Sequence, residues 1–372
     1  MQTFSFFPGG FGYDFSNPAV DMPTAIDVVS RNLVKHGVTA YCPTLVTQPA
    51  ANYAVLLPQI RRGPVRGGAT ILGVHVEGPF ISPEKKGAHP EEYIQKGELG
   101  SLERIQAVYS DLANVAIITV APELDTTDVI RRLAEYRRPG EEKEKTKKTT
   151  GSIVVSLGHS TANLAESERA FANGARMITH LFNAMPVFHH RDPGLLGLLT
   201  VDSRPLGPGH RQIYYGIIAD GIHTHYSALR LAYHANRTGM VLVSDAISAC
   251  GLSSGIHMIG TQRVEIKDNR AYVAGTDTLC GAIALLDHCV KNLYHSVDGC
   301  SVVEAIDCAT LHPARTLGIE DRKGTLNFGA DADFVLLDSQ TLDVLATFVD
   351  GRLVFVNEEG RCPVELGLLK AL

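Results

Sequence analysis

Three side chains that can bind a metal ion follow short apolar segments of the sequence. Glu77 ends the segment ILGVHVE, His159 follows SIVVSLG and His180 follows ARMIT. A catalytic divalent cation commonly takes three protein ligands and leaves one position open for water. Carboxylate and imidazole ligands suit zinc and iron(II). Together the three residues predict a metal site, whereas each one alone would also fit a core histidine, a surface histidine or a carboxylate at a helix N-terminus.

Asp245 and His223 are candidates for proton transfer and substrate polarisation. Asp245 follows the apolar segment MVLVS, and a carboxylate beside a metal site can take a proton from water and pass it to a leaving group. Its alternative role is the N-cap of a following helix. His223, in ADGIHTH, could polarise a carbonyl or hold a substrate hydroxyl. A metal pair of His223 and His225 is the alternative, because residues i and i+2 of a strand share a face.

Basic residues near these segments could bind an anion. Arg191, in HHRDPG, offers a planar guanidinium that binds phosphate through two parallel hydrogen bonds, although an arginine is ordinarily a solvated surface residue. Lys85 and Lys86 lie in a polar loop after Glu77. We expect this loop to cover the mouth of a barrel, although loop lysines are usually solvated.

Short β-branched segments alternate with amphipathic stretches along the chain, which predicts βα units and a parallel sheet. The amphipathic stretches include 163–173 and 227–237, and a further helix is expected over 127–136. Polar residues at the ends of many strands favour a TIM (β/α)8 barrel, in which active sites gather at the C-terminal ends of the strands. We expect the three candidate ligands on consecutive βα units. A doubly wound sheet is the alternative fold, but no G-x-G-x-x-G motif follows an early strand.

The chain is expected to divide into a barrel and a small β-rich part. Residues 1–317 carry the alternating pattern and are predicted to form the barrel. Residues 318–372 change in character and are predicted to supply the strands of a small sandwich, with turns at 327–329 and 350–351.

One segment inside the barrel domain is strongly charged. Residues 139–150 are predicted to form a solvated surface loop, because seven of the eight residues in 141–148 (EEKEKTKK) are Glu or Lys.

Composition places the chain among ordinary globular proteins. Of 372 residues 45% are hydrophobic, and the net charge is −6, so no basic excess predicts binding to nucleic acid or to an anionic membrane. No apolar run reaches the length of about 18 residues that a membrane span needs. The opening residues do not resemble a signal peptide. Seven scattered cysteines without a C-x-x-C motif indicate reduced thiols and a cytoplasmic protein.

A set of motifs follows in one order along the chain: HVEGPF with KKGAH, LGHS, THLFNAM with HHRDPG, ADGIHTH, VSDA and KGTLNFGADADFVLLD. Together they resemble the motifs of the N-acetylglucosamine-6-phosphate deacetylase family of the amidohydrolase superfamily, at near-family spacing. The resemblance runs from about Gly9 to about Val356, and THLFNAM followed by HRDPG is its most specific part.

The resemblance implies a TIM barrel of the metal-dependent hydrolase type with a small β-sandwich appendage. It implies hydrolysis of the N-acetyl group of the sugar phosphate to glucosamine 6-phosphate and acetate, in amino-sugar catabolism. It carries the metal ligands onto Glu77, His159 and His180 and the general base and acid onto Asp245, while His223 would face the acetyl carbonyl or the sugar. The residues that would line the sugar and phosphate pocket are Ala88, His89, Asn183, Ala184, Arg191, Leu279, Cys280 and Gly281.

The same resemblance implies one divalent cation per subunit, with zinc as the first expectation and iron or cobalt as alternatives. It also implies a phosphosugar substrate, no nucleic-acid or membrane partner, and a homodimer whose phosphate site borrows groups from the neighbouring subunit. The family lacks the H-x-H pair that most amidohydrolases carry on strand 1, and no early H-x-H occurs in this sequence.

The N-terminal segment departs from the family pattern. Family members have sandwich strands upstream and a strand 1 that ends in Asn-Gly, whereas this chain opens MQTFSFFPGGFGYDF. We expect a truncated or alternatively started form with an incomplete sandwich, in which Phe4 to Phe7 partly substitute as a barrel strand. Two smaller departures are the charged loop and Cys280, which lies where a small hydroxyl-bearing residue is expected.

Two other functions stay open on the sequence alone. The chain could act on another amide or cyclic amide, although Arg191 and THLFNAM argue against this. It could also be a folded but catalytically impaired isoform that dimerises with, or competes with, a complete enzyme. The site residues are present, whereas the missing part is structural, and loss of a barrel strand would expose two sheet edges.

Overall fold

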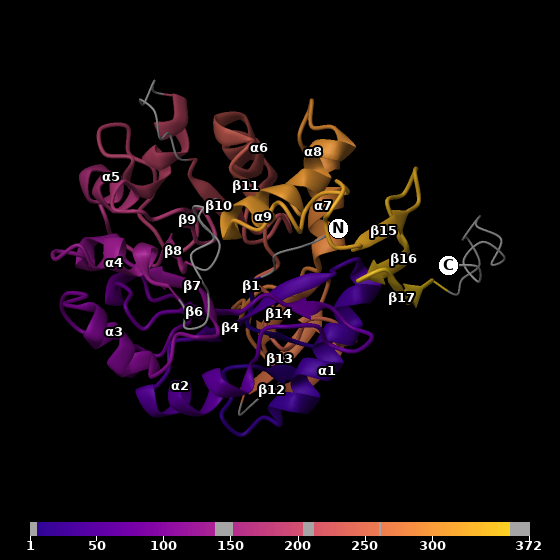
Figure 1. Cartoon of the computed structure of the whole chain (residues 1–372), viewed down its shortest axis with the longest axis horizontal. Coiled ribbons are helices and arrows are strands. Elements are labelled where there is room, and N and C mark those ends of the chain that lie inside the picture. The colour runs from indigo at the N-terminus through magenta and orange to yellow at the C-terminus, as the bar shows by residue number, and fades with distance from the viewer. Residues whose placement is uncertain (1–5, 138–151, 204–211, 260–261, 358–372) are drawn as a thin grey trace.

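The central element of the molecule is a parallel sheet that forms a TIM-like barrel (Figure 1). This computed structural model describes residues 6–137, 152–203, 212–259 and 262–357. Neighbouring strands follow the order β1-β4-β6-β7-β8-β9-β10-β11, and β5 pairs with β4 outside this path. These strands are β1 Phe6–Phe7, β4 Ala40–Val46, β5 Thr70–Ile71, β6 Val74–Glu77, β7 Val115–Val120, β8 Val154–Leu157, β9 Met177–Ile178, β10 Tyr214–Ile217 and β11 Met240–Leu242.

Backbone hydrogen bonds join the two ends of this sheet. The amide of Gly9 donates to the carbonyl of Ala246 at 3.0 Å, and the amide of Gly12 donates to the carbonyl of Ser248 at 2.8 Å. The chain that follows β1 therefore lies against the chain that follows β11. The predicted parallel α/β barrel is confirmed.

Helices lie around the outside of the sheet (Figure 1). Two of the predicted helices are confirmed as α5 and α6, and the helix expected over 127–136 is α4. Asn163 starts α5 with a capping box, since its side chain accepts from the amide of Glu166 while the Glu166 carboxylate accepts from the amide of Asn163. The helices are α1 Met22–Leu33, α2 Ala50–Leu56, α3 Leu102–Tyr109, α4 Val129–Glu135, α5 Leu164–Ala172, α6 Tyr226–Asn236, α7 Leu286–Ser296, α8 Val302–Asp307 and α9 Leu311–Leu317.

The strand β7 corrects one expectation. All six of its residues are buried, as is usual for a parallel strand covered on both faces. In the sheet β7 lies between β6 and β8, so Glu77 and His159 are not on consecutive βα units as expected. No candidate residue was assigned to the segment VAIITV, so this strand was not counted between them.

The N-terminal residues Phe6 and Phe7 form the first strand of the barrel. They pair in parallel with Cys42 and Pro43 of β4. Phe7 is fully buried, and its ring packs edge-on against Tyr41 with centroids 6.4 Å apart. The expectation that this segment substitutes as a strand is confirmed for these two residues, because the position beside β4 is filled.

Two three-stranded antiparallel sheets accompany the barrel, and the short strands β2 Gly9–Gly10 and β3 Tyr13–Asp14 form a third antiparallel pair. The C-terminal sheet was expected, and Asp350 and Gly351 both have positive φ in the tight turn between β16 and β17. The other sheet, β12-β13-β14, was not predicted. Its strands and those of the C-terminal sheet are β12 Gly255–Ile259, β13 Gln262–Lys267, β14 Arg270–Val273, β15 Phe334–Leu337, β16 Val344–Val349 and β17 Arg352–Val356.

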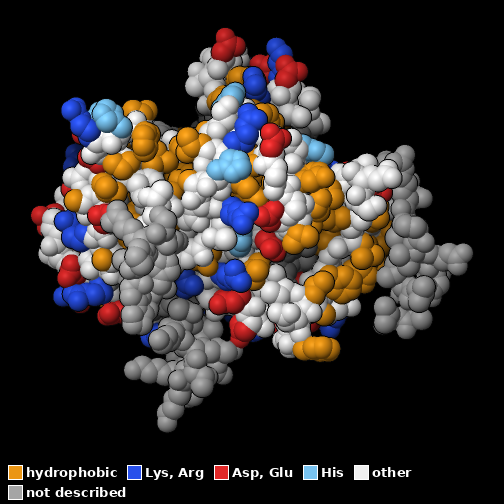
Figure 2. All heavy atoms as spheres, turned by 90° about the horizontal axis from the view of Figure 1, so that it is seen from above, with side chains coloured by type: hydrophobic (Ala, Val, Ile, Leu, Met, Phe, Trp, Pro, Cys, Tyr) orange, Lys and Arg blue, Asp and Glu red, His pale blue; other side chains and the backbone are white. Residues whose placement is uncertain are grey.

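Several expectations lie outside the described residues, namely the charged loop 139–150, the segment 358–372 with Cys362, and Phe4. The division of the chain after residue 317 stays a prediction. None of the helices in the described part of the chain is long and apolar enough to span a membrane. On the face drawn in Figure 2, basic and acidic side chains lie interspersed, which agrees with the moderate net charge of −6.

Candidate metal centre

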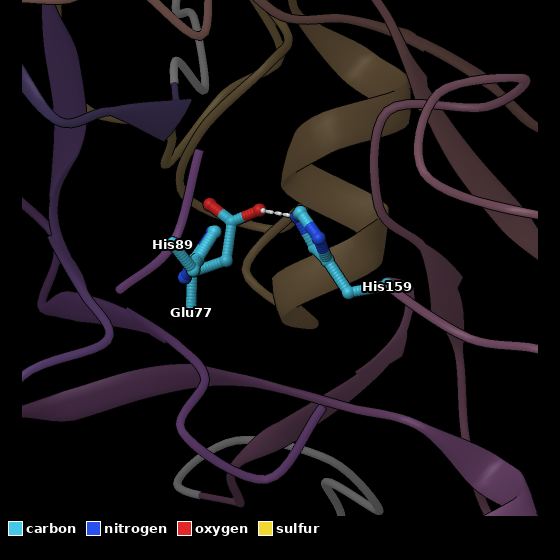
Figure 3. Close-up of side chains that lie close together, drawn as sticks. All are labelled: Glu77, His89 and His159. Carbon is cyan, nitrogen blue, oxygen red and sulfur yellow. Dashed lines mark hydrogen bonds and ion pairs between the residues drawn. The ribbon is translucent and has the colours of Figure 1, made fainter. Parts of the chain in front are cut away.

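Glu77, His159 and His180 meet at the C-terminal edge of the parallel sheet. Glu77 ends β6, while the two histidines follow β8 and β9. One carboxylate atom, Oε1 of Glu77, lies 3.0 Å from Nε2 of His159 and 3.0 Å from Nε2 of His180. The two Nε2 atoms lie 2.9 Å apart. Figure 3 shows His159 pointing at the Glu77 carboxylate, and all three side chains are buried.

The donor set fits a divalent cation. Nδ1 of His159 donates to the carbonyl of Lys85 at 2.8 Å, which leaves the lone pair of Nε2 directed at Glu77. Tetrahedral zinc with bonds of about 2.1 Å places its ligands about 3.4 Å apart, close to the separations seen here. Among the described residues Nδ1 of His180 is buried without a hydrogen-bond partner, so Nε2 is the atom of that ring engaged with the cluster.

Burial, charges and hydrogen bonds within the cluster shift the pKa values of Glu77 and His180. Burial raises the pKa of Glu77, but the hydrogen bonds and charges of His159 and His180 outweigh it, and the net pKa is well below the ordinary value. Burial lowers the pKa of His180, but the hydrogen bond and charge of Glu77 raise it to about 9. Both shifts reflect the attraction between the Glu77 carboxylate and the two imidazoles, and a metal ligand must be a neutral imidazole.

His89 lies in the same cluster. Glu77, His89 and His159 form a second group whose ligand atoms all lie within 4.8 Å of one another, and the His89 and His159 rings are 4.5 Å apart. Nδ1 of His89 is engaged with the hydroxyl of Thr47 at 2.7 Å, and burial together with the charge of His159 lowers the pKa of His89 to about 3. Because its Nδ1 is already engaged with Thr47, His89 is a less available ligand than His180 in this arrangement, and its expected place in the pocket beside the metal stays a prediction.

The backbone at these strand ends is strained. His159, His180, Ala184 and Asp245 have φ of 48°, 23°, 50° and 51°, in the left-handed region that residues other than glycine rarely adopt. Each such residue costs about 1–3 kcal/mol and persists only where the surroundings hold it, typically at functional sites.

Asp245 lies beyond the end of β11. It makes no hydrogen bond or ion pair with another described residue, and burial together with the charge of Glu77 raises its pKa to about 6. The next helix in the chain is α7, which begins at Leu286, so the alternative of a helix N-cap is wrong. The structure thus presents an uncommitted carboxylate within electrostatic reach of Glu77.

His223 is held by Asp220. Its Nδ1 donates to Oδ2 of Asp220 at 2.7 Å, and its amide donates to Oδ1 at 2.7 Å, which leaves Nε2 of the ring available. Burial raises the pKa of Asp220, but the hydrogen bond and charge of His223 outweigh it and lower the pKa. Nδ1 of His225 accepts from the amide of Ser227 at the start of α6, so His225 is the N-cap of that helix.

The residues expected in the sugar and phosphate pocket come from three loops. Gly87 lies next to Ala88, and a Cβ placed on Gly87 would lie 3.5 Å from the His159 ring, so this loop lies against His159. Asn183 and Ala184 follow His180 closely, and the carbonyl of Ala184 accepts from the amide of Ser160 at 3.2 Å.

The remaining expected pocket residues are Arg191 and the segment 279–281. Arg191 is exposed and pairs with no carboxylate of the described residues. The segment of Leu279, Cys280 and Gly281 leads to Ala282, which bridges in parallel to Ala246, the residue after Asp245. Their roles stay predictions.

A buried polar chain beneath the cluster was missed by the sequence analysis. His75 binds the hydroxyl of Thr44 through Nδ1 at 3.2 Å and that of Thr119 through Nε2 at 2.8 Å. Thr119 contacts the hydroxyl of Thr179 at 2.8 Å, and Thr179 contacts that of Ser156 at 2.6 Å. The signal in the sequence was spacing, because His75 precedes Glu77 by one strand period and so points to the same face.

Comparison with known proteins agrees with this arrangement. The model of the amidohydrolase family matches residues 18–354. The N-acetylglucosamine-6-phosphate deacetylase of Bos taurus is 51% identical over 358 residues, which cover 95% of this chain and 82% of that protein.

Solved structures show the same fold. The N-acetylglucosamine-6-phosphate deacetylase of Thermotoga maritima aligns with a TM-score of 0.77 at 28% identity, covering 95% of this chain and 88% of the other. A mutant of the Mycobacterium smegmatis enzyme, in complex with N-acetyl-D-glucosamine-6-phosphate, aligns with a TM-score of 0.75 at 28% identity, covering 95% of this chain and 86% of the other. The barrel and its strand-end cluster define a barrel hydrolase. The chain belongs to the amidohydrolase family and, within it, to the N-acetylglucosamine-6-phosphate deacetylases.

Proposed function

We propose that this chain hydrolyses the N-acetyl group of N-acetyl-D-glucosamine 6-phosphate to D-glucosamine 6-phosphate and acetate, in amino-sugar catabolism. The observation that carries the proposal is the Glu77 oxygen that lies 3.0 Å from two histidine nitrogens. The 51% identity to a deacetylase of this substrate supports the choice of reaction.

Glu77, His159 and His180 would hold one divalent cation, zinc in the first place, with iron or cobalt compatible with the same donors. When bound, such a cation supplies Lewis acidity that makes water nucleophilic near neutral pH and polarises the acetyl carbonyl. The carbonyl of Lys85 keeps Nε2 of His159 available to it, since it accepts from Nδ1.

Asp245 acts as base and then as acid in this proposal. Its carboxylate accepts the proton of the attacking water as the carbon–oxygen bond forms. It then delivers that proton to the sugar nitrogen as the carbon–nitrogen bond breaks, so that acetate and a free amine leave. Nε2 of His223 is directed at the acetyl carbonyl or the sugar and stabilises charge that develops on oxygen. Asp220 fixes the orientation of that ring.

The phosphate end of the substrate is assigned to Arg191, which is exposed and unpaired among the described residues. Its guanidinium offers two parallel hydrogen bonds to phosphate oxygens. The remaining pocket residues are Ala88, His89, Asn183, Ala184, Leu279, Cys280 and Gly281. A homodimer in the cytoplasm, with a phosphate site that takes groups from the second subunit, completes the proposal.

The test is acetate release by the purified chain, with bound metal counted per chain. We expect acetate from N-acetylglucosamine 6-phosphate and much less from N-acetylglucosamine without the phosphate. Bound metal without acetate from this sugar would contradict the proposal and favour another amide as substrate. A folded chain without metal or activity would favour the impaired isoform.

A further inference from the structure

His159 is carried by a short loop, residues 158–161, whose backbone belongs to no helix or strand. Its φ of 48° lies in a region that a residue with a side chain adopts only when its surroundings impose it. The loop therefore needs contacts that hold it in place. The direction of Nε2 of His159 depends on those contacts.

Glu123 supplies three of these contacts with one carboxylate. Its Oε1 accepts from the amide of Thr161 at 2.7 Å and from the hydroxyl of Thr161 at 3.0 Å. Its Oε2 accepts from the hydroxyl of Ser160 at 2.6 Å. Ser160 and Thr161 directly follow His159, so these three hydrogen bonds hold the backbone next to the strained residue.

Glu123 lies in a short helical turn, and its carboxylate has no further hydrogen-bond partner among the described residues. It lies in the 3-10 helix Pro122–Leu124, directly after β7. There the amide of Leu124 donates to the carbonyl of Ala121 at 3.1 Å. Within the described part of the chain, no lysine, arginine or histidine forms an ion pair with Glu123. A half-buried carboxylate without a cation is thus committed entirely to the loop of His159.

Nδ1 of His159 also donates to the carbonyl of Lys85 at 2.8 Å, and two further contacts of this loop use backbone atoms alone. The carbonyl of His159 accepts from the amide of Ser82 at 2.8 Å, and the amide of Ser160 donates to the carbonyl of Ala184 at 3.2 Å. A substitution cannot remove these. Glu123 is a side chain on a neighbouring strand end, and its loss can be tested directly.

We propose that Glu123 is a positioning residue of the cation site, which holds Ser160 and Thr161 so that Nε2 of His159 faces Glu77. The inference rests on the proposed cation site. Glu123 makes no hydrogen bond to Glu77, His159 or His180 and acts on the site through the backbone of the loop.

The test measures zinc affinity of the metal-free chain in competition with a chromophoric chelator. Glu123→Ala is expected to weaken zinc binding by about 10- to 100-fold, the usual effect of losing a group that orients a ligand. Glu123→Gln keeps one accepting oxygen, and its amide can donate to the Ser160 hydroxyl, so we expect affinity within about threefold of the parent. With zinc saturating, KM for the sugar is expected to stay unchanged in Glu123→Ala, because Glu123 is not among the residues assigned to the sugar and phosphate pocket.

Glu166→Ala is the matched control. Glu166 also accepts from a backbone amide, that of Asn163, but it makes no hydrogen bond to residues 158–161. The Glu166→Ala variant is expected to bind zinc with the same affinity as the parent. Equal zinc affinity of Glu123→Ala and the parent would overturn the proposal, and so would a Glu123→Gln variant as weak as Glu123→Ala.

A second variant covers the case in which Glu123→Ala does not fold. Ser160→Ala combined with Thr161→Val removes the two hydroxyl donors and is expected to weaken zinc binding in the same direction, whereas parent-like affinity would overturn the proposal. A parent chain that binds zinc without releasing acetate contradicts the proposed reaction alone. The affinity comparison between the variants still decides the role of Glu123.

Discussion

Nε2 of His159 lies 2.9 Å from Nε2 of His180, and both atoms face the same oxygen of Glu77. Two ring nitrogens this close repel each other if both carry protons. A divalent cation between them removes the conflict and satisfies all three groups at once. The arrangement is therefore expected to be more stable with the cation than without it.

Removal of the cation should lower the thermal stability of the chain. A ligand present at about 1,000 times its Kd stabilises the folded state by about 4 kcal/mol. We expect a chelator to lower the unfolding temperature of the parent, and to have much less effect on Glu77→Gln. The control is Glu103→Gln on the surface of α3, which should respond like the parent. Equal chelator responses of Glu77→Gln and the parent would argue against the cation site.

Asp245→Asn separates metal binding from turnover. The amide keeps the size of the side chain but cannot accept the proton of water, so kcat should fall by about 100- to 10,000-fold. Bound metal per chain should stay unchanged, because Asp245 is not among the three ligands. The comparison variant is Asp338→Asn in an exposed turn, which should keep full activity. A near-normal kcat of Asp245→Asn would remove this residue from the mechanism.

Phe7 is predicted to be essential for the closed barrel. It is fully buried in the first strand, and truncation to alanine leaves a cavity that costs about 3–5 kcal/mol. The free energy of unfolding in urea measures this loss. Phe328 is the natural comparison, because its side chain is fully exposed, and Phe328→Ala should change stability by less than about 0.5 kcal/mol. Similar losses in the two variants would mean that the first strand contributes little.

Candidate site residues could be predicted from the sequence where residues of catalytic type lie at the ends of predicted strands. Glu77, His159, His180 and Asp245 each follow an apolar run, and parallel strands in one barrel bring such residues to one edge. The left-handed backbone at His159 was not predictable, because it depends on Glu123 and other contacts far away in the sequence. The spacing of His75 before Glu77 placed it on the same face, but its hydroxyl partners lie far away in the sequence, and this chain was missed.

Two elements of the fold could also not be predicted from the sequence. No residue after β7 was singled out from the sequence, although Glu123 follows the strand by three positions, so the count of strands between Glu77 and His159 came out one short. The sheet β12-β13-β14 has exposed apolar residues such as Ile256 and Met258, which blur the alternation of buried and exposed positions that marks a strand. Pairing with neighbouring strands, rather than local pattern, forms this sheet.

His312 should make the stability of the chain depend on pH. It is buried, and its Nδ1 donates to the carbonyl of Met240 at 2.8 Å. Burial lowers its pKa below 6.5, although the bond to Met240 and the charge of Asp307 raise it; the charge of Arg315 lowers it further. The unfolded chain therefore takes up a proton first, and the contribution of His312 is complete above about pH 6.5 and declines as the pH falls towards the lowered pKa.

His312→Asn tests this dependence. The asparagine amide can donate to the Met240 carbonyl in place of Nδ1, but it does not titrate. As the pH falls from about 7.5 to about 5.5, the free energy of unfolding should decrease less in the variant than in the parent. The two decreases should differ by up to about 1.4 kcal/mol for each unit by which the pKa of His312 is lowered. The control is His295→Asn at an exposed position of α7, which should follow the parent. Parallel pH profiles for His312→Asn and the parent would show that protonation of His312 does not limit stability in this range.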